Sequence, residues 1–275
     1  NNVAEISNGA VEIDWIGGPE VVPRQELGEA VRTGAIDATL APSGWMRSSV
    51  PEANFLNYSR VTYAVLHERG WDEWLRGVYA EKMGTLWIGR GAWDQPYYMG
   101  TTFPVSTLAD LKGHICASPP SLEIFSEALG MVVADIEEEF TAMEQGVLEA
   151  VITPAYPQYV DGLMELQTHW VDHPVLDSAL VLVGNLEKNN SLPANLQNVL
   201  ADAHAMSIPD MTTESRKWND LGNQKAKEMG LTIVTLPPAE AEYFVDLAYD
   251  VAWENNAPGV LTPESIATLK EYFAK

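Results

Sequence analysis

The sequence predicts an α/β fold built from two similar lobes, and three observations lead to this prediction. A pattern of helix end, glycine, short apolar strand and proline occurs at residues 30–42 and again at residues 142–154. The two copies lie about a hundred residues apart, which is the spacing of domains rather than of a solenoid repeat. Apolar strand patterns also alternate with helical patterns along the chain. Finally, 275 residues with 46% hydrophobic content can bury two ordinary cores.

The elements expected in the first part of the chain follow from hydrophobic periodicity and from glycine and proline breaks. Residues 11–15 alternate apolar and acidic side chains, which predicts a half-buried strand. A helix is expected from Arg24 to Thr33, because its apolar residues fall on one face and Gly34 follows as a stop. The next expected elements are a strand at 36–41, helical structure at 58–82 and a strand at 86–89.

The pattern restarts near Leu108 and continues to the end of the chain. Pro119 opens a helix that Gly130 closes. Because strands alternate with helices, the sheets are expected to be largely parallel. The expected strands are 115–117, 132–133, 150–152, 180–184 and 231–236, and the other expected helices are 136–145, 191–206, 214–229, 239–254 and 263–273.

The lobes are expected to be joined by ordered connections that cross more than once, because no low-complexity linker divides the chain. Residues 1–92 and about 181–230 are assigned to lobe I, and residues 93–180 and about 231–275 to lobe II. Ligands of α/β sheets bind beyond the carboxyl ends of the strands. The turns after the two repeated strands, at 42–45 and 153–156, would then form the two walls of one cleft, although such turns are also common in α/β chains without a site.

The composition excludes several classes of function. The formal charge of −23, from 39 acidic and 16 basic residues, repels phosphate backbones and anionic membrane surfaces, so nucleic acid is not an expected partner. No apolar run approaches the roughly 20 residues that cross a bilayer, and the first residues lack the pattern of a signal peptide. The single cysteine, Cys116, excludes an internal disulfide and is expected to be a small buried hydrophobe.

Three motifs occur in a fixed order: D-L-K-G at residues 110–113, F-x-x-x-L-G at residues 125–130 and T-A-M-E-Q-G at residues 141–146. Together they resemble the substrate-binding proteins of TRAP transporters, the DctP type. Further matches at 27–37, 50–52 and 191–197 extend the resemblance over almost the whole chain.

The resemblance implies a two-lobed periplasmic-binding-protein-like fold with a hinge and an inter-lobe ligand cleft. It implies an exported, periplasmic receptor that closes on a small organic solute and delivers it to membrane-embedded TRAP permease subunits. Such a receptor is not an enzyme, needs no cofactor or metal, and is expected to be a monomer. Members of this family begin with an extra strand before the counterpart of residues 3–9. The sequence is therefore expected to be truncated there, since the alternative, a lost strand, would expose an interior edge.

The sequence departs from the family at positions that there hold a ligand carboxylate. The strand at 114–118 has no arginine, Arg90 is displaced so that Trp93 lies nearer the expected place, and Thr153 replaces an asparagine. A carboxylate buried without a cationic partner costs several kcal/mol, so a simple dicarboxylate is disfavoured.

Aromatic residues in the expected cleft loops are instead predicted to form a cage. Such a cage suits an aromatic or apolar acid, or a cationic or zwitterionic solute. Serine and threonine hydroxyls are expected to add hydrogen bonds, and each candidate also has a structural interpretation as a core aromatic, a helix cap or a surface ion pair. The candidate ligand-binding residues are Ser43, Trp45, Arg90, Trp93, Tyr97, Tyr98, Ser118, Thr153, Tyr156 and Tyr159.

Two other functions are alternatives to a transport receptor. A cleft hydrolase or transferase would need a nucleophile with a base, or a metal cluster, and the sequence has no G-x-S-x-G, H-E-x-x-H or phosphate-loop motif. His169 and His173 lie four residues apart, but Pro174 argues against a helix there, so no metal site is expected. A sensory ligand-binding subunit stays open, because its sequence pattern would be the same.

Overall fold

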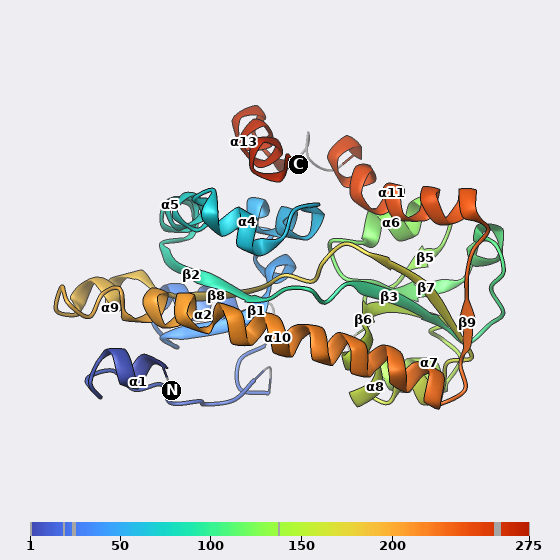
Figure 1. Ribbon diagram of the computed structural model, residues 1–275, viewed down its shortest axis with the longest axis horizontal. Coiled ribbons are helices and arrows are strands. Elements are labelled where there is room, and N and C mark those ends of the chain that lie inside the picture. Colours follow the sequence, from blue (N-terminus) through green and yellow to red (C-terminus); the bar gives the residue numbers. More distant parts are fainter. Residues whose placement is uncertain (1, 19, 24–25, 137, 256–259, 275) are drawn as a thin grey trace.

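Two β-sheets lie side by side in the protein, and helices cover both of them (Figure 1). The computed structural model describes residues 2–18, 20–23, 26–136, 138–255 and 260–274. One sheet has three strands in the order β1-β8-β2, and the other has six in the order β5-β4-β6-β3-β7-β9. The strands are β1 (Ala38–Pro42), β2 (Thr85–Ala92), β3 (Tyr97–Thr101), β4 (Ile115–Ala117), β5 (Val132–Val133), β6 (Ala150–Pro154), β7 (His169–Val175), β8 (Leu180–Asn185) and β9 (Thr232–Val234).

Strand pairing is mixed, so the expectation of largely parallel sheets is wrong. In the three-stranded sheet, β8 runs antiparallel to both β1 and β2. In the six-stranded sheet, β3 is antiparallel to β6 and β7, whereas β4 is parallel to β5 and β6, and β7 to β9. The reason lies in the connections between the sheets. Strand β2 leads to β3, and β7 leads to β8, by short segments without a helix, whereas parallel neighbours need a long crossover connection.

The helices form layers on the sheets. Helices α6 and α11 lie on one face of the six-stranded sheet, and α7 and α8 lie on the other (Figure 1). The helices are α1 (Asn2–Ile6), α2 (Leu27–Thr33), α3 (Pro51–Asn54), α4 (Tyr63–Glu68), α5 (Trp71–Met83), α6 (Glu123–Ala128), α7 (Glu139–Glu144), α8 (Ala155–Val160), α9 (Leu186–Ser191), α10 (Val199–Glu228), α11 (Pro238–Asn255) and α13 (Pro263–Phe273), with 3₁₀ turns η2 (Ser43–Met46), η3 (Phe55–Tyr58), η4 (Leu108–Leu111) and η5 (Leu163–Glu165).

Helix α10 extends along both halves of the molecule (Figure 1). It packs against α1 and β2 in one half and against α8 in the other. The sequence predicted two helices here, ending near residue 206 and beginning again near 214, and this prediction is wrong. Pro209 lacks the N–H that a regular helix uses, and the helix nevertheless continues through it. Beside it, the hydroxyls of Thr212 and Thr213 donate to the carbonyls of Ile208 and Pro209.

The two halves share a core. Segments 93–96 and 176–179 cross between the sheets, as α10 does. One buried hydrophobic cluster includes Val183 of β8 and Ile152 of β6, so the halves are packed against each other. Burial of such side chains stabilises each by about 1.5–3 kcal/mol relative to exposure.

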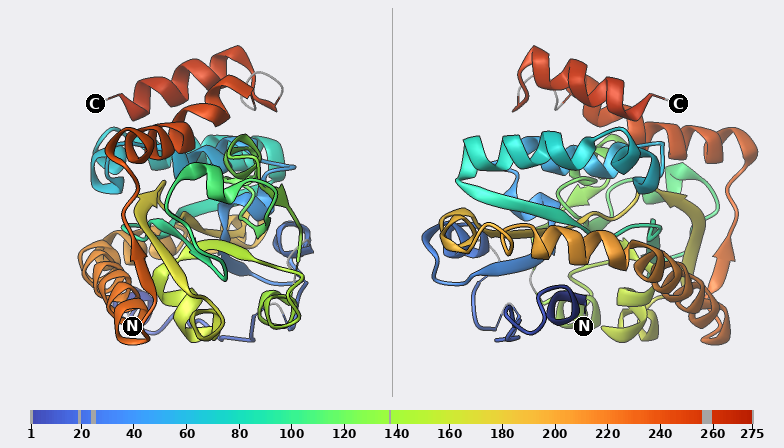
Figure 2. Two further views of the ribbon diagram at one scale, coloured as in Figure 1. Left: turned by 90° about the vertical axis from the view of Figure 1, so that its right-hand side faces the viewer. Right: turned by 60° about the vertical axis from the view of Figure 1, so that its left-hand side comes forward.

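The last helix, α13, lies at the outer surface above α4 and α5 (Figure 2). The ring of Phe273 lies 5.3 Å from that of Trp71 in α5, and Ser265 donates a hydrogen bond to Glu52 in α3. The exact limits of the two lobes, including the expected assignment of residues 231–275 to lobe II, stay a prediction.

Most expected elements are confirmed, and the exceptions have local causes. Gly34 ends α2 with a φ of 76°, as predicted, whereas the expected helix start at Arg24 lies outside the described residues. The strand expected at 11–15 is wrong: that segment is irregular, and Ile13 and Trp15 are 60% and 77% exposed. Alternation predicts a strand only where a neighbouring strand supplies hydrogen bonds, and this segment pairs with no strand of either sheet.

Two helical glycines provide a test of the packing of α10 against α8. A Cβ at Gly222 in α10 would lie 2.4 Å from the backbone nitrogen of Tyr156, whereas a Cβ at Gly77 in α5 meets nothing within 4 Å. We expect Gly222→Ala to lower the free energy of unfolding by about 2 kcal/mol, because α8 would have to move. Gly77→Ala is expected to raise it by up to about 1 kcal/mol through helix propensity. Urea unfolding measures both, and a stabilised Gly222→Ala variant would contradict the contact.

Candidate functional site

A small cavity lies between the two sheets, where the turn after β1 meets the turn after β4. Its volume of about 20 Å³ corresponds to about one water molecule. Both turns follow the carboxyl ends of strands, where α/β sheets present ligand-binding groups. The lining residues are Pro42, Ser43, Gly44, Asn54, Asn57, Tyr97, Pro119, Pro120, Ser121 and Ala179.

The two walls of this cavity are in contact. A Cβ at Gly44 would lie 3.1 Å from Cβ of Pro120 and 3.2 Å from Oδ1 of Asn54. A side chain at position 44 would crowd Pro120 on the opposite wall, so the glycine allows the walls to approach this closely. The first wall is the turn predicted from the repeated pattern. The second wall is formed by residues 119–121, and the turn at 153–156, which the sequence placed there, does not line this cavity.

Two buried amides shape the first wall. Asn57 uses its whole amide: Nδ2 donates to Oγ of Ser43 and to the carbonyl of Asn54, and Oδ1 accepts from the N–H of Ala179. It therefore fixes the turn after β1 relative to segment 176–179. Asn54 is only 3% exposed, and its Oδ1 accepts no hydrogen bond from the described part of the chain. A buried acceptor without a donor costs about 1–3 kcal/mol, so this atom is the unusual one in the cavity.

Two tyrosine hydroxyls belong to the same region. Tyr58 donates a hydrogen bond to the carbonyl of Ser121, which joins η3 to the opposite wall. Burial raises the pKa of Tyr97, although hydrogen bonds with Ser178 and Ser121 oppose the rise. Burial also raises the pKa of Tyr58. Both phenols therefore stay protonated at neutral pH, and the hydroxyl of Tyr58 acts as a hydrogen-bond donor to Ser121.

Arg90, a predicted ligand residue, is held at the crossing between the sheets. Its side chain is 1% exposed, and Nη2 lies 2.8 Å from Oδ2 of Asp177. The same nitrogen donates to the carbonyls of Asp177 and Ser178. The other carboxylate oxygen of Asp177 accepts from the N–H of Gln95. Arg90 thus binds the two crossing segments together, and it does not line the cavity.

The predicted aromatic residues lie in different places. Trp93 is 3% exposed, donates from Nε1 to Thr212 of α10, and packs on Tyr63 with ring centroids 4.8 Å apart. Tyr98 stacks on Trp170, with ring centroids 5.2 Å apart, in a separate core cluster of the six-stranded sheet. Only Tyr97 reaches the cavity.

The remaining aromatic candidates lie outside this cavity. Tyr156 of α8 packs on Trp218 of α10, with ring centroids 4.3 Å apart. Tyr159 lies one turn further along, 5.5 Å from Nζ of Lys225. Trp45 in η2 is half-buried against the main core. The five aromatic residues of the expected cage are therefore not gathered into one cage, and a ligand role for any of them stays a prediction.

The two remaining polar candidates also have protein partners. Oγ of Ser118 accepts from Oγ of Ser126, 3.1 Å away. The carbonyl of Thr153 accepts from Nε2 of Gln158, 2.9 Å away. Neither lines the cavity.

The cavity therefore brings together Ser43 and Tyr97 of the predicted set with residues that the prediction omitted. Asn54 and Asn57 are the most informative omissions. The signal was present in the sequence, because two amides interrupt an otherwise apolar run at residues 53–58. Such amides in a buried run require partners.

Within the described ranges, no group of three or more His, Cys, Asp or Glu side chains is placed to hold a metal ion. In those ranges, too, no helix combines the length and apolarity that crossing a membrane requires.

The Arg90–Asp177 pair can be tested by removing the cation. We expect Arg90→Leu to lower the free energy of unfolding by about 3 kcal/mol, because Asp177 would keep a partly buried charge without its partner. The matched control is Arg32→Leu, which breaks the exposed pair with Glu29 and should change stability little. Chemical denaturation compares the two, and equal losses would mean that the crossing does not depend on Arg90.

Cys116 is buried, as predicted. Burial raises the pKa of its thiol to about 12, and a hydrogen bond with Ser126 opposes the rise. Because the fold disfavours the thiolate, the thiol contributes stability below its ordinary pKa of about 9 that is lost as the pH rises toward 12.

We therefore expect no reaction of native protein with a disulfide reagent at pH 8, and one equivalent of reaction in denaturant. Absorbance of the released chromophore measures this, and rapid reaction of the native protein would contradict the burial.

Comparisons with known proteins agree with this architecture. The family described as "Bacterial extracellular solute-binding protein, family 7", DctP, matches residues 1–255. A curated relative, the C4-dicarboxylate-binding periplasmic protein DctP of Rhodobacter capsulatus, is 26% identical over 269 residues, which cover 94% of this chain and 76% of the relative.

Solved structures share the fold. A TRAP periplasmic solute-binding protein from Desulfovibrio salexigens with bound orotic acid has a TM-score of 0.85 at 20% identity, covering 99% of this chain and 91% of that one. DctP7 of Bordetella pertussis, a receptor binding pyroglutamic acid, has a TM-score of 0.82 at 18% identity, covering 100% and 92%. An apo open structure from Marinobacter aquaeolei has a TM-score of 0.85 at 16% identity, covering 100% and 92%. The two-lobed architecture and the family match together show that this chain belongs to family 7 of the bacterial extracellular solute-binding proteins, the DctP family of TRAP transporter receptors.

Proposed function

We propose that this protein is the periplasmic receptor of a TRAP-type transporter, capturing a small organic solute between its two sheets and delivering it to membrane-embedded permease subunits. Membership of the DctP family supports this proposal, and so does the position of the cavity between two halves joined by crossing segments. Members of this family are receptors rather than enzymes.

The physical basis of capture is lobe closure. A ligand shifts the open and closed populations by its differential affinity for them. Contacts that exist only when the walls meet therefore set how strongly the closed state is favoured. The hydrogen bond from Tyr58 to Ser121 joins the two walls, and we propose that it is a contact of this kind. The ion pair between Arg47 and Glu123, with a distance of 3.1 Å, is another, but both side chains are well exposed and such pairs contribute little.

The lining of the cavity favours a particular solute chemistry. Neither lysine nor arginine is among the described residues that line it, and Arg90 already serves Asp177. The wall instead supplies the hydroxyls of Ser43 and Tyr97 and the amide of Asn54. We therefore propose a solute that is an organic acid or zwitterion carrying hydroxyl or N–H groups, rather than a simple dicarboxylate.

The observation that carries this proposal is the buried Oδ1 of Asn54. An acceptor in this position is satisfied by a hydroxyl or amine of the solute, whereas a carboxylate oxygen would face it unfavourably. Related structures contain solutes with such donors: one from Roseobacter denitrificans holds L-galactonate, and one from Chromohalobacter salexigens holds (S)-(+)-2-amino-1-propanol.

The proposal predicts that Asn54→Leu weakens solute binding by about 10- to 100-fold, the loss expected when a buried hydrogen bond is removed. Mass spectrometry of co-purified compounds first identifies candidates, and calorimetry then compares polyhydroxy acids, amino alcohols, pyroglutamate and malonate. Asn195→Leu, an exposed amide replaced in the same way, is the control.

Two outcomes would count against different parts of the proposal. If no small solute binds, the receptor function fails. If malonate binds best and Asn54→Leu leaves its affinity unchanged, the receptor function stands and the solute chemistry is wrong.

A further inference from the structure

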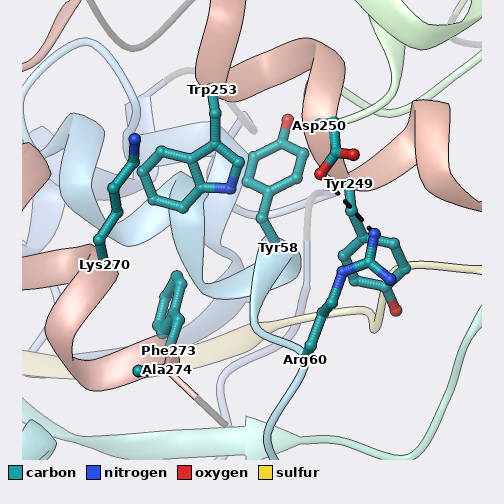
Figure 3. Close-up of a pocket in the computed structure, with 8 residues that line it drawn as sticks. All are labelled: Tyr58, Arg60, Tyr249, Asp250, Trp253, Lys270, Phe273 and Ala274. Carbon is teal, nitrogen blue, oxygen red and sulfur yellow. Dashed lines mark ion pairs between the residues drawn. The ribbon is translucent and has the colours of Figure 1, made fainter.

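A second and larger pocket lies on the outer side of the molecule, between the segment after η3 and helices α11 and α13 (Figure 3). Its volume of about 190 Å³ admits a small organic molecule rather than a single water. The segments that form it come from three distant parts of the sequence. It is linked to the cavity between the sheets through Tyr58, which lines this outer pocket and whose hydroxyl donates a hydrogen bond to Ser121 of that cavity.

Aromatic rings form the wall of this outer pocket. The rings of Tyr58 and Trp253 meet edge to face with centroids 6.4 Å apart, and those of Trp253 and Phe273 do so at 6.0 Å. Figure 3 shows that these rings stand together on one side of the pocket, with Tyr249 beyond them. Faces and edges of aromatic rings attract a further flat ring, which gains contact area at little cost in conformational entropy.

Two cations flank the row of rings, one at each end (Figure 3). The guanidinium of Arg60 lies 4.2 Å from the ring centroid of Tyr249, and it pairs with Asp246 at 3.0 Å and Asp250 at 3.7 Å. At the other end, Nζ of Lys270 lies 5.7 Å from the ring centroid of Trp253. This distance is within the range of a cation–π attraction, and Lys270 itself is exposed at the rim of the pocket.

The charges at the two ends are therefore unequal. The charge of Arg60 is balanced by two carboxylates, one of which, Asp250, also lines the pocket. Lys270 forms no ion pair with any carboxylate in the described part of the chain. In a chain of net charge −23, such a cation beside an aromatic wall is a local attraction for an anion. A simple gap in the packing would show no such difference in charge between its two ends.

We propose that this pocket binds a small aromatic carboxylate that carries a hydrogen-bond donor opposite its carboxylate. The ring lies against Trp253 and Phe273, the carboxylate meets Nζ of Lys270, and the donor meets the carboxylate of Asp250. This site is separate from the cavity between the sheets, and it does not depend on which solute the receptor captures.

The proposal makes a directional prediction about three probes. 4-Hydroxybenzoate is expected to bind with a Kd on the order of 1 mM, benzoate more weakly because it lacks the donor, and terephthalate most weakly because its second carboxylate faces Asp250. Calorimetry or ligand-observed NMR with the full chain measures the three affinities.

Variants identify the site. Lys270→Gln should weaken 4-hydroxybenzoate binding about 10-fold, whereas Lys217→Gln, which removes an exposed lysine paired with Glu214, should have no effect. Asp250→Asn should narrow the difference between 4-hydroxybenzoate and terephthalate, and Arg60 keeps its closer partner Asp246 in that variant. Thermal unfolding of each variant confirms that the fold is retained.

Three results would overturn the proposal. The first is that no probe binds at about 10 mM, well above the expected Kd. The second is that Lys270→Gln binds 4-hydroxybenzoate as the wild type does. The third is that Asn54→Leu abolishes probe binding, because this would place the probe between the sheets.

Discussion

The arrangement of the two halves depends on the buried ion pair between Arg90 and Asp177. Arg90 belongs to β2 and Asp177 to the segment that enters β8, so the pair holds both crossing segments at one point. Separating the charges would leave the buried guanidinium of Arg90 without its carboxylate partner, which is strongly unfavourable. Tyr97 and Ala179, which lie just beyond the pair on these two segments, are thereby held in the wall of the cavity. Arg90 thus positions residues that line the cavity, and its own expected contact with a ligand stays a prediction.

Much of the fold could be predicted because its signals are local. Gly34 and Gly146 end helices in the left-handed conformation, with φ of 76° and 69°, and the strands after them were found from their apolar runs. Strands β3 and β7 were missed because their composition is not typical of strands: β3 contains Gly100, and β7 contains two histidines and Pro174. Their hydrogen bonds are made with strands that are distant in sequence, and no local sequence pattern indicates which strands those are.

The candidate site was less predictable, and the reason is geometric. Tyr97 and Tyr98 are adjacent in β3, and successive side chains of a strand point to opposite faces, so only one of them reaches the cavity. The expected aromatic cage stays a prediction, but adjacent residues of a strand do not face the same side. Asn54 and Asn57 were missed for another reason, since burial of a polar side chain depends on the other wall, which comes from residues far along the chain. The positions of turns could be inferred, but the contacts across them could not.

The continuous helix α10 has a mechanical consequence. On one side of Pro209, His204 donates to the carbonyl of Arg90, and on the other side Thr212 accepts from Trp93, so the helix is fastened to the crossing region at both points. The proline leaves one carbonyl of the preceding turn without its helical donor, which locally lowers the bending stiffness. A rotation of one half against the other would then concentrate the curvature in a single turn of a 30-residue rod, and the rest of the rod would move as two rigid arms.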